Sequence, residues 1–433
     1  MNKLLEVREF EKISCNPDFK TEYAYLPESA FRDLEEFIHA FAGDDEYSDA
    51  LEFLKIGFRR NVGNIISVNN YVGLIQIHNG YQIQVLPKID FGDDADSIND
   101  ETKRVFLRML RSMRDFPSKV FNEANLKMDR MTLYEIFINM YLQEVRTLVK
   151  YGIKSAYIAR EDNLNYYKGK LIVNDHIKRN AAHGERFYVC YDEYLVDRAE
   201  NRLVKATLLK LQGITISAEN QKEIRQLLTS FEMVRPSVNY QKEFSKVVID
   251  RNTKDYEMLM RWSRVFLLNK SFTTFSGGTN ARALLFPMEK VFESFVAQQL
   301  KKALVELDWE VSTQDKGYYL FDSPRQFALR PDIVVTREDG SKIILDTKWK
   351  SLVDKPRSNY GISQADMYQM YAYSKKYDTP EIWLLYPVNS EMRNHQDISF
   401  NSDDGVNVRL FFVDVAKMEK SMQSLRVLLE GKV

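Results

Sequence analysis

The sequence predicts an α+β or α/β protein of several domains. We expect a β-rich N-terminal domain over residues 1–125, a mostly helical middle region over 126–250, and a C-terminal domain over 255–433 with a mixed central sheet flanked by helices. Residues 64–89 alternate as strands do, residues 131–152 and 197–213 have helical spacing, and residues after 286 switch between the two patterns. A length of 433 residues allows about three domains.

The N-terminal domain contains the clearest hairpin signal. Tyr81, Ile83 and Val85 alternate with glutamines, and the pair Asn79-Gly80 precedes them. An Asn-Gly pair favours a type I′ turn, because both central residues of that turn need positive φ. Before residue 60 the sequence leaves the fold open.

The middle region combines helices with a basic and aromatic segment. The helices at 131–152 and 197–213 each end at a glycine. Between them, residues 166–194 interleave two kinds of side chain that suit contact with a DNA backbone: Lys168, Lys170, Lys178, Arg179, Arg186, Tyr166, Tyr167, Phe187 and Tyr188. Acidic residues are interspersed, so an ordinary solvated surface also fits, and both interpretations stay open.

The C-terminal domain predicts a regular succession of elements. An amphipathic helix over 286–304 precedes strands over 327–335 and 342–350, which a turn at 338–340 joins. A helix over 364–377 and two further strands follow, over 381–386 and 408–414. The two strands before the second helix can therefore pair as a hairpin.

That hairpin carries a charged constellation inside apolar sequence. Asp346 and Lys348 are two residues apart on one strand, so their side chains point the same way, and pairing can bring Asp332 beside Asp346. Two converging carboxylates repel each other unless they share a cation, and hard oxygen ligands favour Mg²⁺. The backbone carbonyl of Thr347 could add a ligand. An Asp–Lys ion pair at the strand ends is the purely structural alternative, but burying such charges is costly.

This constellation suits hydrolysis of a nucleic-acid backbone. A bound Mg²⁺ polarises a phosphodiester and lowers the pKa of a water molecule. The ammonium group of Lys348 can orient that water and offset the charge of the transition state.

Composition excludes several other classes of protein. The chain is 44% hydrophobic and 28% charged, with a net charge of −1, as in ordinary globular proteins. Two cysteines, Cys15 and Cys190, cannot build a disulfide framework or a four-thiolate zinc site, and the five histidines have no metal-ligand spacing. We find no signal-peptide pattern and no apolar stretch long enough for a membrane span, so we expect a cytoplasmic protein without a membrane partner.

The motifs RPDIVV and ILDTKWK, followed by QADMYQMYAY, resemble the PD-(D/E)XK nuclease superfamily with its trailing glutamine–tyrosine motif. More narrowly, the chain resembles the McrC family, the nuclease subunit of McrBC-type restriction systems. Residues 85–89, 133–152, 191–208 and 287–296 are also similar to that family. The resemblance covers most of the chain from about residue 60 and is strongest in the C-terminal domain.

The resemblance implies a role for each motif residue. Asp332 and Asp346 match the metal ligands, and Lys348 matches the catalytic lysine. Glu293 matches the helix glutamate, which would be a further catalytic residue and metal ligand, with Glu289 as the alternative. The metal is expected to be Mg²⁺, for which Mn²⁺ could substitute. The glutamine–tyrosine motif matches Gln369 and Tyr373, which would lie against the active site or the DNA backbone unless they only pack the helix.

The resemblance also implies partners: an AAA+ GTPase of the McrB type and double-stranded DNA. The sequence has no GxxxxGK[ST] loop, so a nucleotide motor would act in trans, and the basic segment 58–61 is a candidate to engage it. Two nuclease subunits could meet within such a complex. A non-catalytic DNA-holding adaptor and a stand-alone repair or transposon nuclease are the alternatives. The sequence leaves open which DNA sequence or methylation state is recognised.

Overall fold

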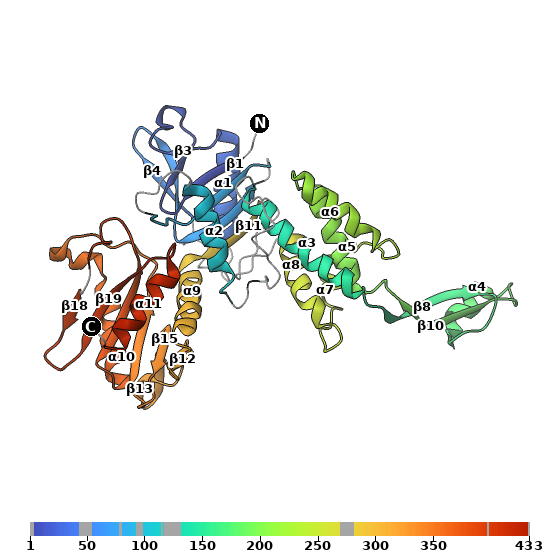
Figure 1. Ribbon diagram of the computed structural model, residues 1–433. Coiled ribbons are helices and arrows are strands. Elements are labelled where there is room, and N and C mark those ends of the chain that lie inside the picture. Colours follow the sequence, from blue (N-terminus) through green and yellow to red (C-terminus); the bar gives the residue numbers. More distant parts are fainter. Residues whose placement is uncertain are drawn as a thin grey trace. The chain divides into compact units, whose positions relative to one another are not determined.

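The computed structural model describes residues 4–42, 54–77, 80–91, 98–113, 116, 131–268, 281–395 and 398–431. The chain forms two compact units (Figure 1). The first unit combines residues 1–116 with 277–433, and the second unit consists of residues 117–276. The sequence assigns the N-terminal and C-terminal segments to separate domains. In the structure they share a unit, because β11 (Ala281–Pro287) pairs antiparallel with β6 (Tyr71–Ile77).

The sheet that joins the two segments has the strand order β1-β7-β6-β11. Its remaining strands are β1 (Leu4–Arg8), which is parallel to its neighbour, and β7 (Gln82–Leu86). The expected hairpin is present between β6 and β7. Gly80 has the positive φ that such a turn needs, at 76°, whereas Asn79 lies outside the described residues.

A second sheet occupies the region that the sequence leaves open. Its strand order is β3-β2-β5-β4. The strands are β3 (Ala24–Tyr25), β2 (Lys12–Ser14), β5 (Gly63–Val68) and β4 (Leu54–Arg59). Helix α1 (Glu28–Ala42) contacts β6 and β11 of the first sheet, and α2 (Ile98–Leu110) contacts β7.

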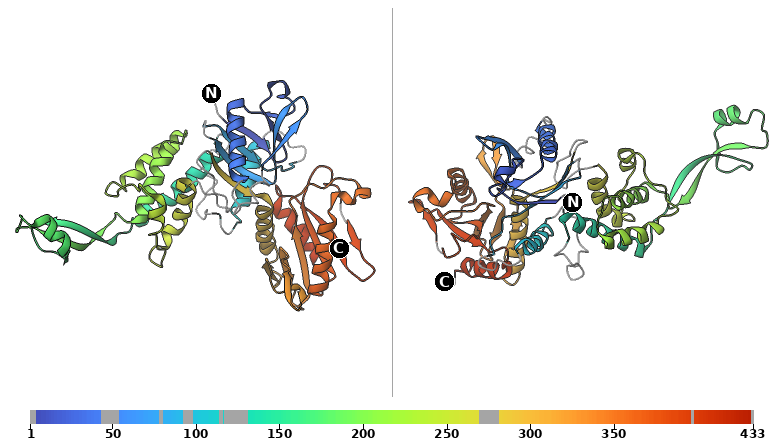
Figure 2. Two further views of the ribbon diagram at one scale, coloured as in Figure 1. Left: turned by 180° about the vertical axis from the view of Figure 1, so that it is seen from behind. Right: turned by 90° about the horizontal axis from the view of Figure 1, so that it is seen from above.

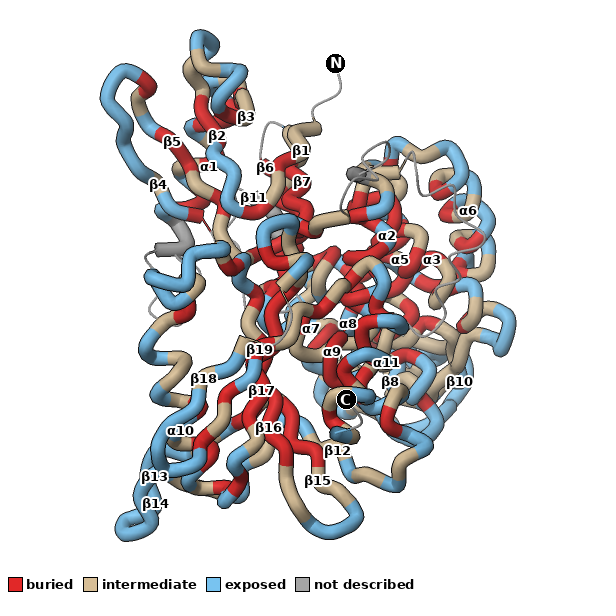
Figure 3. The backbone as a smooth tube through the Cα atoms, turned by 60° about the vertical axis from the view of Figure 1, so that its left-hand side comes forward, coloured by how far each residue is buried: buried red, intermediate tan, exposed pale blue. Residues whose placement is uncertain are grey.

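The mixed central sheet expected in the C-terminal segment has the order β12-β15-β16-β17-β19-β18 among the described residues. These strands are β12 (Glu310–Thr313), β15 (Ile333–Thr336), β16 (Lys342–Thr347), β17 (Glu381–Pro387), β19 (Asn407–Val413) and β18 (Ser399–Asn401). Strands β16, β17 and β19 run parallel, and the outer strands pair antiparallel. Figure 3 shows the central strands buried along most of their length.

Helices cover this sheet. Ile344, Ile382 and Leu384 belong to one apolar cluster with residues of α10 (Gln364–Tyr377). The alternate residues of these strands point to the other face, where α9 (Met288–Ala303) contacts β16 and α11 (Met418–Leu429) contacts β19. The mixed α/β architecture of the prediction is thereby confirmed.

One predicted strand is interrupted. The sequence pattern suggests a continuous strand over 327–335, but β14 (Arg325–Ala328) ends before β15 begins at Ile333. Pro331 lies in the gap and has no N–H to donate to a neighbouring strand. β14 instead pairs with β13 (Tyr319–Asp322) in a hairpin whose residues are mostly exposed (Figure 3).

The second unit is built around helices with an aromatic core. Its helices are α3 (Leu133–Tyr151), α4 (Val173–Asn180), α5 (Ala199–Gln212), α6 (Ala218–Thr229), α7 (Tyr240–Phe244) and α8 (Glu257–Leu268). The predicted helices at 131–152 and 197–213 correspond to α3 and α5. The Trp262 and Phe266 rings stack at 5.5 Å between centroids, and Phe137 and Tyr141 of α3 pack against them.

An antiparallel sheet of order β8-β10-β9 adds to these helices. The strands are β8 (Ala156–Leu164), β10 (Phe187–Leu195) and β9 (Lys170–Leu171). Figure 2 shows the ribbon of β8 and β10 extending away from the helices of the same unit, with α4 near its far end. This extension contains the basic and aromatic segment that the sequence singles out.

Candidate active site

The pairing of β15 with β16 brings two aspartates together. Ile333 pairs with Leu345, so Asp332, just before β15, lies next to Asp346 in β16. Asp346 is only 1% exposed. Thr347 fixes Asp332 by donating hydrogen bonds to its Oδ2 from the backbone N–H, at 2.8 Å, and from the hydroxyl, at 2.7 Å. The predicted hairpin and the predicted approach of the two aspartates are therefore present.

Lys348 closes the cluster at the end of β16. Its Nζ lies 2.7 Å from Asp346 Oδ2 and 3.9 Å from Asp366 Oδ1. Its backbone N–H donates to the carbonyl oxygen of Leu385 at 2.9 Å, so the residue is tied to β17. Asp346 and Lys348 point the same way, as their spacing predicts.

The predicted glutamine and tyrosine lie against this lysine. Lys348 Nζ donates to Gln369 Oε1 at 3.3 Å, and Gln369 Nε2 donates to the hydroxyl of Tyr373 at 2.7 Å. Tyr373 is 1% exposed. Burial, with the nearby charge of Asp346, raises the pKa of the Tyr373 hydroxyl, so it stays protonated and can donate.

The structure distinguishes the two candidate helix glutamates. Glu293 Oε1 accepts a hydrogen bond from Gln314 Nε2 at 2.6 Å, and the same nitrogen lies 3.5 Å from Asp332 Oδ1. Gln314 thus bridges Glu293 of α9 to Asp332. Glu289 instead accepts from the side-chain amide of Asn70 at 3.4 Å. Of the two, Glu293 belongs to the cluster.

The carboxyl groups of the cluster resist ionisation. Burial raises the pKa of Asp346, and repulsion by Asp332 adds to this, while Lys348 opposes it. Burial also raises the pKa of Asp332 against its hydrogen bonds from Thr347. Burial and the charge of Asp332 raise the pKa of Glu293 to about 7. Three carboxyl groups with raised pKa values indicate a site that further positive charge would stabilise.

The donor set fits Mg²⁺. Mg²⁺ is commonly held by one or two carboxylates and keeps several water ligands. Asp332 and Asp346 would supply those carboxylates, with Glu293 and the Thr347 carbonyl nearby. Within the described ranges, no group of three or more acidic, histidine or cysteine side chains is arranged to hold a metal ion by itself.

Sequence reasoning misses two members of the cluster. Asp366 precedes Gln369 by three residues on α10, a spacing that places both on one helix face and could have revealed it. Gln314 follows β12, and its backbone N–H donates to the carbonyl oxygen of Asp332 at 3.0 Å. This contact depends on the pairing of β12 with β15, so no local sequence pattern predicts that Gln314 lies beside Asp332.

The basic and aromatic residues of the second unit form cation–π pairs. Lys168 Nζ lies 4.0 Å from the centroid of the Tyr191 ring, and the Arg179 guanidinium lies 4.7 Å from that of Tyr188. Tyr166 and Tyr167 are 59% and 60% exposed. The arrangement offers cations and exposed rings on one extension, which is compatible with both interpretations of this segment.

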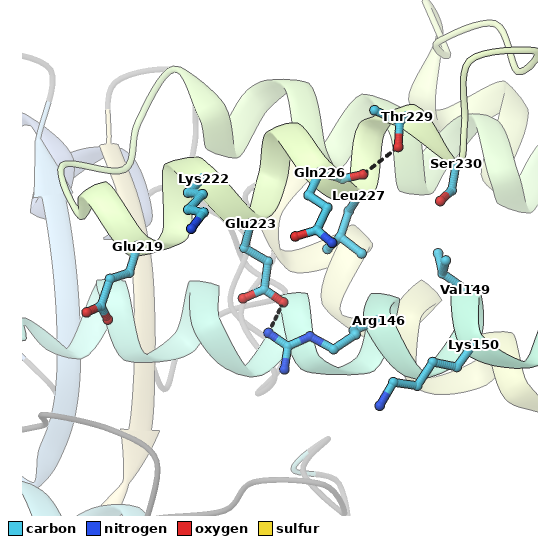
Figure 4. A pocket seen from close by; sticks show the side chains of 10 residues that line it. All are labelled: Arg146, Val149, Lys150, Glu219, Lys222, Glu223, Gln226, Leu227, Thr229 and Ser230. Atoms are coloured by element: carbon cyan, nitrogen blue, oxygen red, sulfur yellow. Dashed lines mark hydrogen bonds and ion pairs between the residues drawn. The ribbon is translucent and has the colours of Figure 1, made fainter.

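A pocket of about 550 Å³ lies between α3 and α6 of the second unit (Figure 4). Its rim contains Arg146, Lys150 and Lys222 together with Glu219 and Glu223. Arg146 and Glu223 form an ion pair across the two helices. This balance of charges is typical of a solvated helix–helix groove.

Comparison with known proteins identifies the family. Residues 66–387 match a family described as McrBC 5-methylcytosine restriction system component. This family model defines the class of protein, which is a component of a restriction system. The chain belongs to the McrBC 5-methylcytosine restriction family, and the resemblance to McrC noted from the motifs is confirmed. No protein with a curated description matches the sequence.

One solved structure has the same fold over nearly the whole chain. A chain in the refined half-complex from the tetradecameric assembly of Thermococcus gammatolerans McrB AAA+ hexamers with bound McrC superposes with a TM-score of 0.69. The two sequences are 17% identical, and the match covers 99% of this chain and 100% of the other. A chain of the Thermococcus gammatolerans McrBC complex, solved by cryo-EM, gives 20% identity over 70% and 88% of the two chains, with a TM-score of 0.49. No helix in the described part of the chain is long and apolar enough to cross a membrane.

Proposed function

We propose that this chain is the Mg²⁺-dependent DNA endonuclease subunit of a McrBC-type restriction system. The observation that carries the proposal is the cluster of Asp332, Asp346 and Lys348 at the end of the β15–β16 hairpin, with Lys348 Nζ 2.7 Å from Asp346. Burying several carboxyl groups beside a single ammonium group costs folding free energy. Such a cluster therefore indicates a functional site. Membership of the restriction family supports a reaction on DNA.

Each residue has a distinct task in this proposal. Asp332 and Asp346 bind the metal, Glu293 supports it, and a bound Mg²⁺ supplies Lewis-acid polarisation of the phosphodiester. Lys348 orients the attacking water and offsets the charge that develops on the phosphate. Gln369 and Tyr373 hold Lys348 in place through their chain of hydrogen bonds, which begins at 3.3 Å from its Nζ.

We further infer that the chain works with an AAA+ GTPase. The solved relative comes from an assembly of McrB AAA+ hexamers with bound McrC, and the sequence of this chain contains no phosphate-binding GxxxxGK[ST] loop. Residues 58–61, at the turn between β4 and β5, stay the candidate for this engagement. Phe58 is 76% exposed there, whereas Arg59 donates to the hydroxyl of Tyr23.

The test is DNA cleavage by the chain assembled with an AAA+ GTPase from the same genome. The assay supplies GTP and Mg²⁺, with plasmids that do or do not contain 5-methylcytosine. We expect the wild type to cleave, and Asp346→Asn to lose at least about a hundredfold in rate while still assembling with the GTPase. Asp339→Asn, an exposed aspartate in the turn between the same two strands, is the matched control and should cleave normally.

Three outcomes would contradict the proposal. Cleavage by Asp346→Asn at the wild-type rate would exclude the cluster as the active site. A wild-type complex that binds DNA but cleaves with neither Mg²⁺ nor Mn²⁺ would support the adaptor alternative. Full cleavage without any GTPase would support a stand-alone nuclease.

A further inference from the structure

A second buried carboxyl group lies outside the cluster, at the end of β1. Glu9 is 1% exposed, and its backbone N–H extends the β1–β7 pair by donating to the carbonyl oxygen of Leu86 at 3.0 Å. Its side chain accepts from Trp349 Nε1 at 3.1 Å to Oε1 and 3.0 Å to Oε2. The backbone N–H of Lys88 also donates to Oε2, at 3.1 Å. Placing a carboxyl group in the interior is costly, so this contact calls for an explanation.

Trp349 follows Lys348 directly. Its indole is 5% exposed and packs on the ring of Phe292, with 5.2 Å between the centroids. Phe292 in turn precedes Glu293 on α9. The Trp349 indole thus contacts the neighbour of Glu293 through the Phe292 ring, and its Nε1 donates to Glu9.

The same N-terminal sheet also supports α9. β11 pairs with β6 and continues directly into α9, whose first backbone N–H, that of Met288, donates to the carbonyl oxygen of Asn70 at 2.9 Å. The sheet that contains β1 is thus connected to α9, the helix with Glu293, because β11 continues directly into that helix. It is also connected to the segment after β16, which contains Lys348, by the hydrogen bond between Glu9 and Trp349. Both sides of the cluster are anchored on one support.

We propose that Glu9 is a positioning residue for Lys348, acting through the Trp349 indole. The inference rests on the proposed nuclease function. With Glu9 in place, the indole cannot rotate away from Phe292, and the backbone at 348 stays where Nζ reaches both Asp346 and Gln369. Burial raises the pKa of Glu9 to about 8, against the hydrogen bonds from Lys88 and Trp349, so the neutral acid predominates at pH 7. Glutamine is therefore a close substitute.

The experiment compares Glu9→Ala, Glu9→Gln, Trp349→Phe and the double variant Glu9→Ala/Trp349→Phe, each as the full chain assembled with its GTPase. Single-turnover cleavage is measured at saturating Mg²⁺ and DNA, below the melting temperature of every variant. We expect Glu9→Ala and Trp349→Phe each to cleave about tenfold to a hundredfold more slowly, as outer-shell changes do. Glu9→Gln should stay within about threefold of the wild type, because its amide oxygen still accepts from the indole.

The double variant and a matched control separate positioning from simple destabilisation. If Glu9 acts through Trp349, the double variant should be no slower than the slower single variant. Glu6→Ala removes a carboxylate of the same strand that bonds to Gln84 and Lys103, and it should lower the melting temperature without changing the rate. The inference would be overturned if the fold-losses in cleavage rate of the two single variants multiplied in the double variant. It would also be overturned if Glu6→Ala and Glu9→Ala lost the same cleavage rate.

Failure of the inference is distinguishable from failure of the proposed function. If the wild type does not cleave, the proposed function fails, and so does the role of Glu9 in catalysis. If the wild type cleaves and Asp346→Asn does not, but folded Glu9→Ala matches the wild type, only the inference fails. Tryptophan fluorescence gives a readout independent of cleavage. The emission contributed by Trp349 is the spectrum of a protein minus the spectrum of the same protein with Trp349→Phe. This emission should differ from that of the wild type in Glu9→Ala and not in Glu6→Ala.

Discussion

Thr347 binds one carboxylate oxygen of Asp332 twice, through its backbone N–H at 2.8 Å and its hydroxyl at 2.7 Å. Both donors come from the strand that also holds Asp346. The orientation of Asp332 is thereby set by its neighbour across the hairpin, and its second oxygen is left to face Gln314 and Glu293. Hydrogen bonds to a carboxylate favour its charged form, so Thr347 helps to keep Asp332 ionised against burial.

The first prediction concerns that hydroxyl. Thr347→Val removes one of the two donors and should weaken Mg²⁺ activation, raising the Mg²⁺ concentration for half-maximal cleavage about tenfold, as a lost outer contact to a ligand does. Thr347→Ser keeps the hydroxyl and should behave as the wild type. A Mg²⁺ titration of the cleavage rate checks both variants. Equal titrations for valine and serine would show that the hydroxyl has no part in holding Asp332.

The second prediction concerns the hydrogen-bond chain to Lys348. Tyr373→Phe removes the hydroxyl that accepts from Gln369, so Gln369 is free to turn away from Lys348. We expect cleavage to slow about threefold to tenfold, because one neutral hydrogen bond contributes about 1 kcal/mol. Tyr368→Phe is the matched control on the same helix, since Tyr368 is 70% exposed. The same rate loss in both variants would rule out a specific role for Tyr373.

The third prediction concerns the stability of the second unit. Asp197, at 5% exposure, accepts from Arg202 Nε and Nη2 at 2.8 and 2.9 Å and from Arg235 N and Nε at 3.0 and 2.8 Å. Burial opposes ionisation of Asp197, but these hydrogen bonds outweigh it and hold its pKa at about 2. A lowered pKa stabilises the folded state above the unfolded value of about 4, and this contribution disappears as the pH falls toward 2.

Asp197→Asn should therefore lower the free energy of unfolding by about 2 kcal/mol at pH 7, and by much less at pH 2.5. Urea denaturation at the two pH values measures the difference. Asp192→Asn, an exposed aspartate on β10, should change neither value. A loss at Asp197 that is independent of pH would show that the ion pairs are not its source.

The fourth prediction concerns DNA contact by the extension of β8, β10 and α4. If it contacts DNA, Lys168→Ala/Arg179→Ala should reduce the slope of log affinity against log salt by roughly 2, one for each lost phosphate contact. Lys150→Ala/Lys222→Ala, at the groove of Figure 4, removes the same charge and should leave the slope nearly unchanged. Equal changes in the two pairs would assign the effect to net charge and contradict a contact on the extension.

The sequence predicts the elements whose signals are local. Helix α10 matches the predicted range 364–377, because Ser363 caps its first turn by accepting from Asp366 N at 3.1 Å and Asp378 ends it with φ at 51°. Strands β16 and β17 are found for the same reason: their apolar runs are flanked by turn residues. The closeness of Asp332, Asp346 and Lys348 follows from a short hairpin, which period and register alone define.

Contacts between distant segments could not be predicted in this way. The parallel pairing of β1 with β7 joins residues about 80 positions apart, and Glu9 meets Trp349 across 340 positions. The alternation in β8 is obscured by charges in AREDNL, so the sheet of the second unit has no clear period. Which strands become neighbours depends on the free energy of the whole fold, and a single sequence does not display it.

The pairing of β6 with β11 has a consequence for a cleaved chain. The strands belong to halves of the first unit that are separated along the chain by the whole second unit, yet they pair from Ala281 to Pro287, and Glu9 adds a buried bond to Trp349. A protease that nicked the backbone once between residues 117 and 276 would leave two fragments on a denaturing gel and a single particle on a sizing column. The N-terminal fragment would stay bound to the fragment that contains Lys348.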